Sequence, residues 1–352
     1  MSQLDAARAQ FAPTPGYLNA ATLGLPPVPV MTALQEALLQ WQSGQAGPVA
    51  YDEAVSQARS GYAALVNVPV EQVAVGSQTS VFAGMVAASL PAGAEVVVIA
   101  EDFTSIVFPF LVQRDRGIRV HQVPRADLAQ AVTDHTDLVV FSLAQSATGH
   151  LVDLPAVLDA AKRHSALTFC DVTQAAGWHP LEADMFDLTV CSAYKWLCQP
   201  RGTAYLTVRS EVMDRLQPVN AGWYAGASVW ESVYGPQMAL ASDARRFDVS
   251  PAWLSWVGAA AATEIFAAVP IKAIQAHDVA LADELRERIG QPLQGRPVLT
   301  VEDPDGSCAQ ALVNAGVTAA SRAGSVRLAC HLWNDETDVD LAATAITSAR
   351  RR

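Results

Sequence analysis

Between residues 71 and 208, short apolar runs rich in β-branched residues alternate with longer helical stretches, and this alternation limits the folds open to the chain. Continuous apolar strands separated by helices are typical of a mainly parallel sheet covered on both faces. Such a sheet places a functional site at the carboxyl ends of its strands. The predicted strands are, in order, QVAVG, AEVVVIA, IRVHQV, DLVVFSL, ALTFCD, DLTVCS and TAYLTV.

The pattern changes after Phe247. Two helical stretches, PAWLSWVGAAAATEIFAAV and IKAIQAHDVALADELRERIG, are followed by a strand, a helix, a strand and a final helix from about Glu336. This order predicts a smaller α+β domain. We therefore expect a large domain over residues 21–256 and a small C-terminal domain over residues 257–352, to which residues 1–20 can add.

Composition narrows the classes of function. The 352 residues carry 23 Lys and Arg against 35 Asp and Glu, a formal net charge of −12, so neither nucleic acid nor an anionic membrane is expected as a partner. The longest apolar runs are far shorter than the roughly 20 residues of a membrane span, and the N-terminus lacks the pattern of a secretory signal. Five cysteines in no disulfide or zinc spacing favour buried, reduced thiols in a cytoplasmic protein, and no metal site is predicted.

Two charged residues follow predicted buried strands. Asp171 closes the run LTFC, where it can hold a protonated ring nitrogen by charge attraction, or simply cap the next turn. Lys195 lies between Tyr194 and Trp196, whose aromatic groups lower the pKa of an amine and suit it to Schiff-base chemistry; a surface lysine is the alternative. Together with Gln174, the pair fits pyridoxal phosphate, with the aldehyde on Lys195 and the ring nitrogen on Asp171.

A phosphate group needs its own binding site, and the stretch VAVGSQTSVFAGM offers one. The strand turns at Gly76, and Ser77 or Thr79 can cap a helix whose free N–H groups and dipole attract an anion. An ordinary helix cap explains the same residues. Phe103, just after the strand AEVVVIA, is placed to stack on the cofactor ring, although a core phenylalanine is the alternative.

Arg327 lies inside the apolar run SVRLACHLW, where an unpaired guanidinium is costly. The carboxylate of an amino-acid substrate would pair with it through two hydrogen bonds. A structural ion pair is the alternative.

The stretch FCDVTQAAGWHPLEADMFDLTVCSAYKWLCQPRGTAYLTV resembles the class V aminotransferase family of fold-type-I pyridoxal phosphate enzymes. This family includes cysteine desulfurases, kynureninases and isopenicillin-epimerase-like proteins. Further segments agree in order, namely YLNAATLGLPP, GSQTS, EDFTSIVFPF, AGWYAG, ARRFDVSPAW and VRLACHLWNDETDVD. The resemblance implies an α/β fold with a mainly parallel seven-stranded sheet, a smaller α+β C-terminal domain, pyridoxal 5'-phosphate as cofactor and a homodimer.

The resemblance also implies roles for single residues. Lys195 would form the Schiff base, and Asp171 would pair with the pyridine nitrogen. Arg327 would bind the substrate carboxylate, and Asn19 would also bind the substrate. The remaining residues expected at the cofactor are Ser77, Gln78, Thr79 and Ser192 at the phosphate, Phe103 on the ring and Gln174 at the phenolic oxygen.

In such a dimer, residues 221–250 would reach the partner's site. This stretch contains AGWYAGASVWESVYGP, whose aromatic side chains are expected to be exposed at an interface. They are Trp223, Tyr224, Trp230 and Tyr234.

Departures from the family pattern bear on the reaction. Kynureninases have His at the position of Gln174 and Asn where this chain has Pro251, which argues against kynurenine as substrate. Desulfurases carry a nucleophilic Cys shortly before the carboxylate-binding Arg, and GVTAASRAGSVRLAC has none there. We therefore predict an aminotransferase acting on a small amino acid. A lyase or an epimerase using the same site is the alternative, and a non-catalytic protein would need a broken site.

Overall fold

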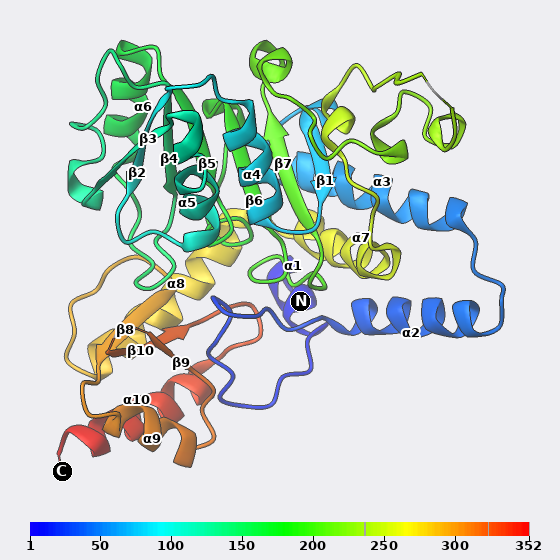
Figure 1. Ribbon diagram of the computed structural model, residues 1–352. Helices are drawn as coiled ribbons and strands as arrows, with labels where there is room; N and C mark the ends of the chain where they lie inside the picture. Colours follow the sequence, from blue (N-terminus) through cyan, green and yellow to red (C-terminus); the bar gives the residue numbers. More distant parts are fainter. Residues whose placement is uncertain (236, 323, 352) are drawn as a thin grey trace.

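A seven-stranded sheet forms the centre of the larger part of the computed structural model, which describes residues 1–235, 237–322 and 324–351 (Figure 1). β7 runs antiparallel to both of its neighbours, β1 and β6, whereas the other neighbouring pairs are parallel. The predicted mainly parallel sheet is confirmed, and each of the seven predicted runs forms a strand. Across the sheet the strands are β1(Val73–Gly76), β7(Ala204–Val208), β6(Leu188–Ser192), β5(Leu167–Asp171), β4(Leu138–Ser142), β2(Glu95–Ile99) and β3(Arg119–Val123).

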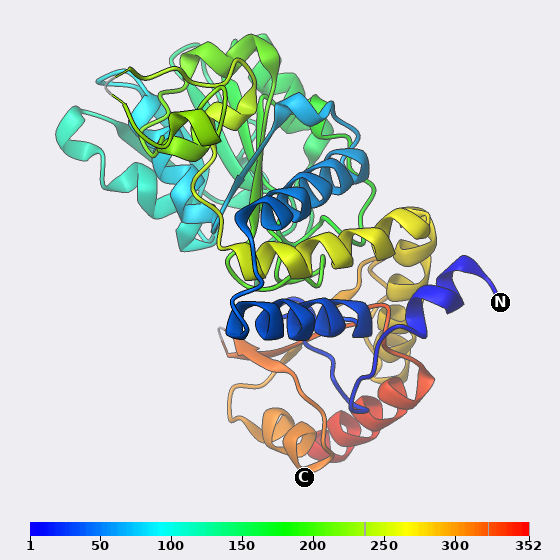
Figure 2. The same ribbon diagram turned by 90° about the vertical axis from the view of Figure 1, so that its right-hand side faces the viewer.

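Helices cover both faces of this sheet because its inner strands are apolar on both sides. Successive residues of one strand enter opposite cores: Val97 packs in one cluster, and Val96 and Val98 pack in the other. One face is covered by α4(Thr79–Ser89) and α5(Thr104–Leu111), and the other by α3(Pro48–Leu65), α6(Leu154–Arg163) and α7(Trp253–Ala268) (Figures 1 and 2).

The edge strand β1 is covered by side chains from two distant segments. Arg59 of α3 donates to the carbonyl of Val73 at 2.7 Å, and Asp248 accepts from the amide of Val75 at 2.8 Å. The two side chains also form a buried ion pair, with 2.7 Å between Nη2 and Oδ2. These contacts satisfy backbone groups that would otherwise be open to another strand.

A second, smaller sheet lies in the C-terminal part, which confirms the predicted α+β domain. Its antiparallel strands are, in order across the sheet, β8(Val298–Glu302), β10(Ser325–Ala329) and β9(Ala320–Arg322). The helices that pack with it are α8(Ile271–Arg288), α9(Ser307–Asn314) and α10(Glu336–Arg350). The short strand β9 was not predicted, because three residues give no periodicity.

The N-terminal segment, with α1(Gln3–Arg8) and α2(Val28–Gln42), connects the two parts. Leu18 bonds through its backbone to Thr318 at 3.0 Å and to Ala329 at 2.8 Å, beside the small sheet. Figure 2 shows α7 and α2 stacked between the large sheet and the small domain.

The predicted domain boundary at 256/257 divides α7, whose residues Trp256, Ala259 and Phe266 pack in the core of the large domain. Leu281 and Leu285 of α8 belong instead to the core of the small domain. We therefore propose a later boundary, within α8.

No single helix in the described ranges is long and apolar enough to cross a membrane; α7 and α8, bent by 88°, meet that criterion only when taken together. The remaining helical segments are short 3-10 turns at Val70–Gln72, Arg114–Arg116, Arg125–Asp127, Ala183–Met185, Ser210–Arg215, Trp223–Ala225, Trp230–Ser232 and Ala244–Phe247.

Candidate active site

The candidate site lies at the carboxyl ends of the parallel strands, as the sequence predicts. β5 ends at Asp171, β6 ends at Ser192, and β1 ends at Gly76 just before α4. Phe103 immediately precedes α5, in the turn that follows β2. Four separate segments of the chain therefore meet at one edge of the sheet.

A cavity of about 340 Å³ lies at the amino end of α4. Thr79 donates its backbone N–H to Ser192 Oγ at 3.1 Å, and the two hydroxyl oxygens are 2.8 Å apart. Gln78, the N-cap residue of α4, makes no capping hydrogen bond with its own side chain, and the positive end of the helix dipole lies beside the cavity. The lining residues are Ser77, Gln78, Thr79, Ser80, Phe103, Ser105, Ser192, Tyr194, Arg201 and Gly202.

Asp171 is buried, and Thr173 holds it in place. The backbone N–H of Thr173 donates to Asp171 Oδ1 at 2.8 Å, while Thr173 Oγ1 accepts from the backbone N–H of Ser192 at 2.9 Å. Burial raises the pKa of Asp171 to about 6, against the opposing effects of the hydrogen bonds from Thr173 and the charge of Lys195. A cationic partner placed against this carboxylate would restore its ordinary ionisation.

Lys195 is a buried amine with 6% of its surface exposed. Its Nζ lies 5.2 Å from the centroid of the Phe103 ring and 5.7 Å from that of Tyr194. In the described part of the chain, Nζ has no hydrogen-bond or ion-pair partner. Burial lowers the pKa of Lys195 to about 8, although the nearby charge of Asp171 acts in the opposite direction.

Gln174 is fixed by contacts at both ends of its amide. Its Oε1 accepts from Trp196 Nε1 at 2.8 Å, which assigns the orientation of the amide. Its Nε2 donates to the carbonyl of Ala21 at 3.0 Å and to Ser146 Oγ at 3.2 Å.

Arg327 projects from β10 toward two loops of the large domain. It donates through Nη1 to the carbonyl of Ser146 and through Nη2 to Thr22 Oγ1 at 2.6 Å, while its buried Nε has no partner among the residues that the structure describes. No carboxylate of the described residues pairs with it, so the predicted alternative of a structural ion pair is not seen there. Asn19, bridged to Ala329 beside this strand, has a buried Oδ1 that also lacks a partner.

The loop that carries Lys195 is held from two sides. The backbone N–H of Gly24 donates to the carbonyl of Tyr194 at 2.9 Å, and a Cβ at Gly24 would lie 1.9 Å from the carbonyl oxygen of Lys195. From the small domain, His331 reaches the carbonyl of Trp196 with Nε2 at 2.8 Å and Asp278 Oδ2 with Nδ1 at 2.8 Å. Both ring nitrogens therefore face acceptors, which favours the doubly protonated ring.

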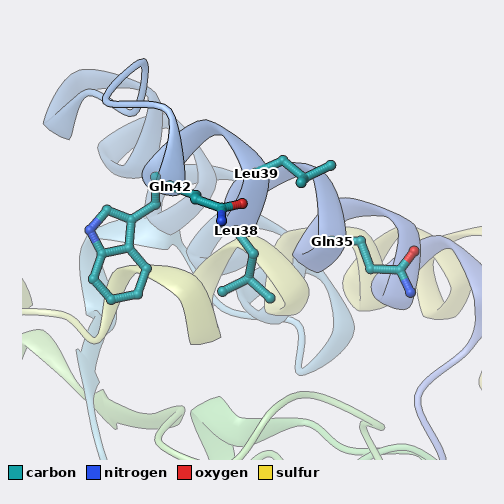
Figure 3. Close-up of a pocket in the computed structure, with 5 residues that line it drawn as sticks. Gln35, Leu38, Leu39 and Gln42 are labelled. Carbon is teal, nitrogen blue, oxygen red and sulfur yellow. The ribbon is translucent and has the colours of Figure 1, made fainter.

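A larger cavity, of about 780 Å³, lies elsewhere, on the exposed side of α2. Figure 3 shows Gln35, Leu38, Leu39 and Gln42 projecting from this helix. None of the described residues that line this cavity is ionisable, so they offer none of the chemistry of the site at the strand ends.

Several residues of the site were missed by the sequence analysis. Thr173, Thr22, Ser146 and His331 become neighbours of the predicted residues only in three dimensions. Arg201 stands six residues after Lys195, and the PRG turn that contains it was a visible signal.

One expectation for residues 221–250 is wrong. Tyr224 is buried within its own chain and donates its hydroxyl to Asp52 Oδ1 at 3.0 Å, because the 3-10 turn at Trp223–Ala225 points it inward. Trp230 and Tyr234 are exposed, as expected, and Trp223 is half-buried.

Comparison with solved structures shows the fold. The cysteine desulfurase CsdA from Escherichia coli superimposes with a TM-score of 0.86 at 20% sequence identity, over 100% of this chain and 99% of that one. The fold is therefore that of the fold-type-I pyridoxal phosphate enzymes, as predicted.

The family follows from the sequence match. The model for Aminotransferase class-V matches residues 17–339, so this chain belongs to the class V aminotransferase family, whose cofactor is pyridoxal phosphate. The chain is 26% identical over 302 residues to an uncharacterised aminotransferase, YcbU, of Bacillus subtilis, covering 80% of each chain. It is 28% identical over 253 residues to a kynureninase of Deinococcus radiodurans, covering 69% of this chain and 60% of that one.

The residues present fit this cofactor. A buried amine without a partner can receive an aldehyde, and a buried carboxylate can face a ring nitrogen. Hydroxyl groups and the positive end of the α4 dipole beside the cavity suit a phosphate.

Proposed function

We propose that this protein is a pyridoxal phosphate-dependent aminotransferase that acts on a small amino acid. The observation that supports this most is the Lys195 amine, which is buried, lacks a partner among the described residues and lies beside the Phe103 ring. With its pKa lowered to about 8 by burial, a useful fraction of this amine is neutral near pH 7–8. A neutral amine can attack an aldehyde and can later accept a proton.

In this proposal the cofactor is held at five places. Lys195 would bind its aldehyde, Asp171 would pair with its ring nitrogen, and Phe103 would stack on its ring. Gln174 would reach the phenolic oxygen by exchanging its 3.2 Å contact with Ser146 for one with the cofactor. The proposed phosphate ligands are Ser77, Gln78, Thr79 and Ser192.

When bound, pyridoxal phosphate supplies an electron-withdrawing ring that stabilises negative charge at the α-carbon of the substrate. The chain's residues do the rest. Asp171 keeps the ring nitrogen protonated, and Nζ of Lys195, once free, takes the α-proton. Arg327 and Asn19 hold the substrate: the guanidinium binds its carboxylate, and the unpartnered Oδ1 of Asn19 can accept from a substrate N–H.

A lyase acting at the same site is the second candidate, because the relatives include a kynureninase and the fold is that of a cysteine desulfurase. The cysteines argue against a desulfurase that forms a persulfide: all five are buried, and burial raises the pKa of Cys170, Cys191 and Cys330 above the usual value for a thiol. Gln174 and Pro251 argue against kynurenine as the substrate. An epimerase would use the same residues.

We also propose that the protein is a homodimer. Leu38, Leu39 and Trp41 of α2 are between 47% and 64% exposed, which is unusual for large apolar side chains gathered on one helix. Residues 221–250 would then lie near the partner's site, with Trp230 and Tyr234 available for contact.

The test is an absorbance titration of the purified protein with pyridoxal phosphate and then with a panel of amino acids. A yellow band is expected in the wild type and in Lys162→Ala and Lys272→Ala, which alter the other two lysines of the chain, but not in Lys195→Ala. An aminotransferase loses the band on adding an amino acid and regains it on adding a keto acid. Recovery without a keto acid, with release of ammonia or another fragment, would identify a lyase, and no band at all would refute the proposed cofactor site.

A further inference from the structure

The cavity at the amino end of α4 contains a charged residue with no assigned role. Among the residues that line it, Arg201 carries the positive charge, and the others are Ser, Thr, Gln, Gly, Phe and Tyr. A phosphate monoester bound there would carry close to two negative charges at neutral pH. Neutral donors and a helix dipole, equivalent to roughly half a charge, offset only part of this.

Arg201 is held in place through its backbone. Gly202 has φ +101°, a left-handed conformation that glycine adopts freely, and it turns the chain directly after Arg201. Ser255 of α7 donates its hydroxyl to the carbonyl of Arg201 at 3.1 Å, and Thr203 donates to that of Pro200 at 2.8 Å. The loop is therefore fixed to a helix of the core.

The side chain of Arg201 lies on an aromatic ring that also borders the Lys195 amine. Its guanidinium carbon is 5.0 Å from the centroid of Tyr194, and Nζ of Lys195 is 5.7 Å from the same centroid. Stacking on an aromatic face leaves the N–H groups at the edge of the guanidinium free to bind an anion.

Arg201 also lacks a competing partner. In the ranges that the structure describes, it forms no ion pair and no side-chain hydrogen bond, and the side chain is exposed. Arg209, which follows the other end of β7, lies instead 3.6 Å from Asp187 and 3.5 Å from Glu211. In a chain of net charge −12, an arginine that faces a cavity without an acidic neighbour suits an anionic ligand.

We propose that Arg201 binds the phosphate of the cofactor. Its full positive charge would offset the part of the phosphate charge that the dipole and neutral donors at the start of α4 leave unbalanced. This inference rests on the proposed function, because it takes this cavity to be the phosphate site. It predicts that Arg201 distinguishes pyridoxal phosphate from pyridoxal, which has the same aldehyde and ring but no phosphate.

The test compares the dissociation constants of apoprotein for pyridoxal phosphate and for pyridoxal, measured by absorbance. Arg201→Gln is expected to raise the dissociation constant for pyridoxal phosphate by about 10- to 100-fold, which is the effect of losing one charge-assisted hydrogen bond. The dissociation constant for pyridoxal should change by less than about 3-fold. Arg201→Lys should recover part of the loss, since it keeps the charge but not the paired N–H groups. The matched control, Arg209→Gln, should leave both constants unchanged.

Stabilisation by inorganic phosphate provides a second readout that needs no cofactor. Millimolar phosphate should raise the melting temperature of the wild-type apoprotein and that of Arg209→Gln, and should raise that of Arg201→Gln much less. The role of Arg201 would be overturned if Arg201→Gln lost the same affinity for pyridoxal as for pyridoxal phosphate, or lost affinity for neither. If the wild type binds neither compound, the proposed function fails and this inference fails with it.

Discussion

At the scale of single residues, the site depends on two ionisable groups whose burial shifts each toward its neutral form. The pKa of Lys195 falls to about 8 and that of Asp171 rises to about 6. Both shifts have burial as their first cause, and the attraction between the two charges opposes both. The cofactor would change this balance by placing a cation against Asp171 and by consuming the amine.

The lowered pKa of Lys195 predicts how fast the apoprotein takes up its cofactor at each pH. The attacking form is the neutral amine, so the initial rate of formation of the yellow band should rise with pH and level off above about pH 8. Stopped-flow absorbance between pH 6 and 10 would measure it. A rate that keeps rising up to pH 10 would mean that the amine has an ordinary pKa.

A second prediction concerns Asp171→Asn. The amide cannot keep a ring nitrogen protonated, so kcat should fall by about 100-fold or more, while the yellow band still forms on Lys195. The control is Asp187→Asn, which alters a carboxylate that accepts from the backbone N–H of Thr168 at 2.8 Å, at the amino ends of β5 and β6. A kcat in Asp171→Asn that matches the control would exclude the proposed role.

The sequence predicts most of the candidate residues at this scale but not their supports. Lys195, Asp171 and Phe103 were predicted from their positions just after apolar runs. Thr79 was predicted as a possible cap of the next helix, and Ser192 from the resemblance to the family. The support that Thr173 gives to Asp171 and Ser192 depends on a contact between two strands, which no local pattern shows.

At the scale of elements, the chain predicts strands better than it predicts their directions. All seven runs of the large sheet were identified, since each is a short apolar stretch between turns. The sequence does not show that β7 is antiparallel to its neighbours, because a strand buried on both faces has the same side-chain pattern in either direction. The contact between Arg59 and Asp248 beside β1 was not predicted either. These residues are 189 positions apart, and no periodic pattern in a sequence links residues so distant.

The loop of Lys195 depends on close approach by the N-terminal segment. Gly24→Ala would place a Cβ against the carbonyl of Lys195, so we expect a displaced loop and affinity for pyridoxal phosphate at least about 10-fold lower. Gly84→Ala in α4 is the control: nothing lies within 4 Å of its added Cβ, and it should be neutral or stabilising by up to about 1 kcal/mol. Equal affinities in the two variants would show that the contact is unimportant.

The buried pair at the edge of the large sheet should matter for stability. Arg59→Met leaves Asp248 buried without its partner and should lower the free energy of unfolding by about 3–5 kcal/mol. Arg163→Met, which breaks the exposed pair with Asp159, should cost less than about 1 kcal/mol. Urea unfolding of both variants measures the difference. Similar losses of unfolding free energy would mean that the buried pair stabilises the fold no more than the exposed pair does.

At the scale of the whole molecule, His331 joins the C-terminal part of the chain to the loop of Lys195. Its ring links Asp278 of α8 to the carbonyl of Trp196, next to Lys195. His277 also contacts Asp278, with Nδ1 2.9 Å from Oδ1. Burial alone would lower the pKa of His331, but the carboxylate of Asp278 outweighs it and raises the pKa to about 10.

This shift has a definite sign. Because the folded protein holds the proton more tightly than the unfolded chain, the stabilisation is complete below about pH 6.5 and disappears as the pH rises toward about 10. Compared with His331→Asn, the wild type should therefore lose its advantage in unfolding free energy between these values. Urea titrations at pH 6, 8 and 10 would measure this, and a constant difference would contradict a protonated His331.

The position of His331 also bears on how the protein is made. When residue 208 has been added to the growing chain, the seven strands and Lys195 have all been synthesised, whereas Asp248 and His331 have not. The edge strand and the Lys195 loop then lack the contacts that hold them, and domains of multidomain proteins generally form in order during synthesis. We expect nascent chains that end before His331 to capture pyridoxal phosphate weakly, so that loading is an event of the finished chain rather than of the growing one.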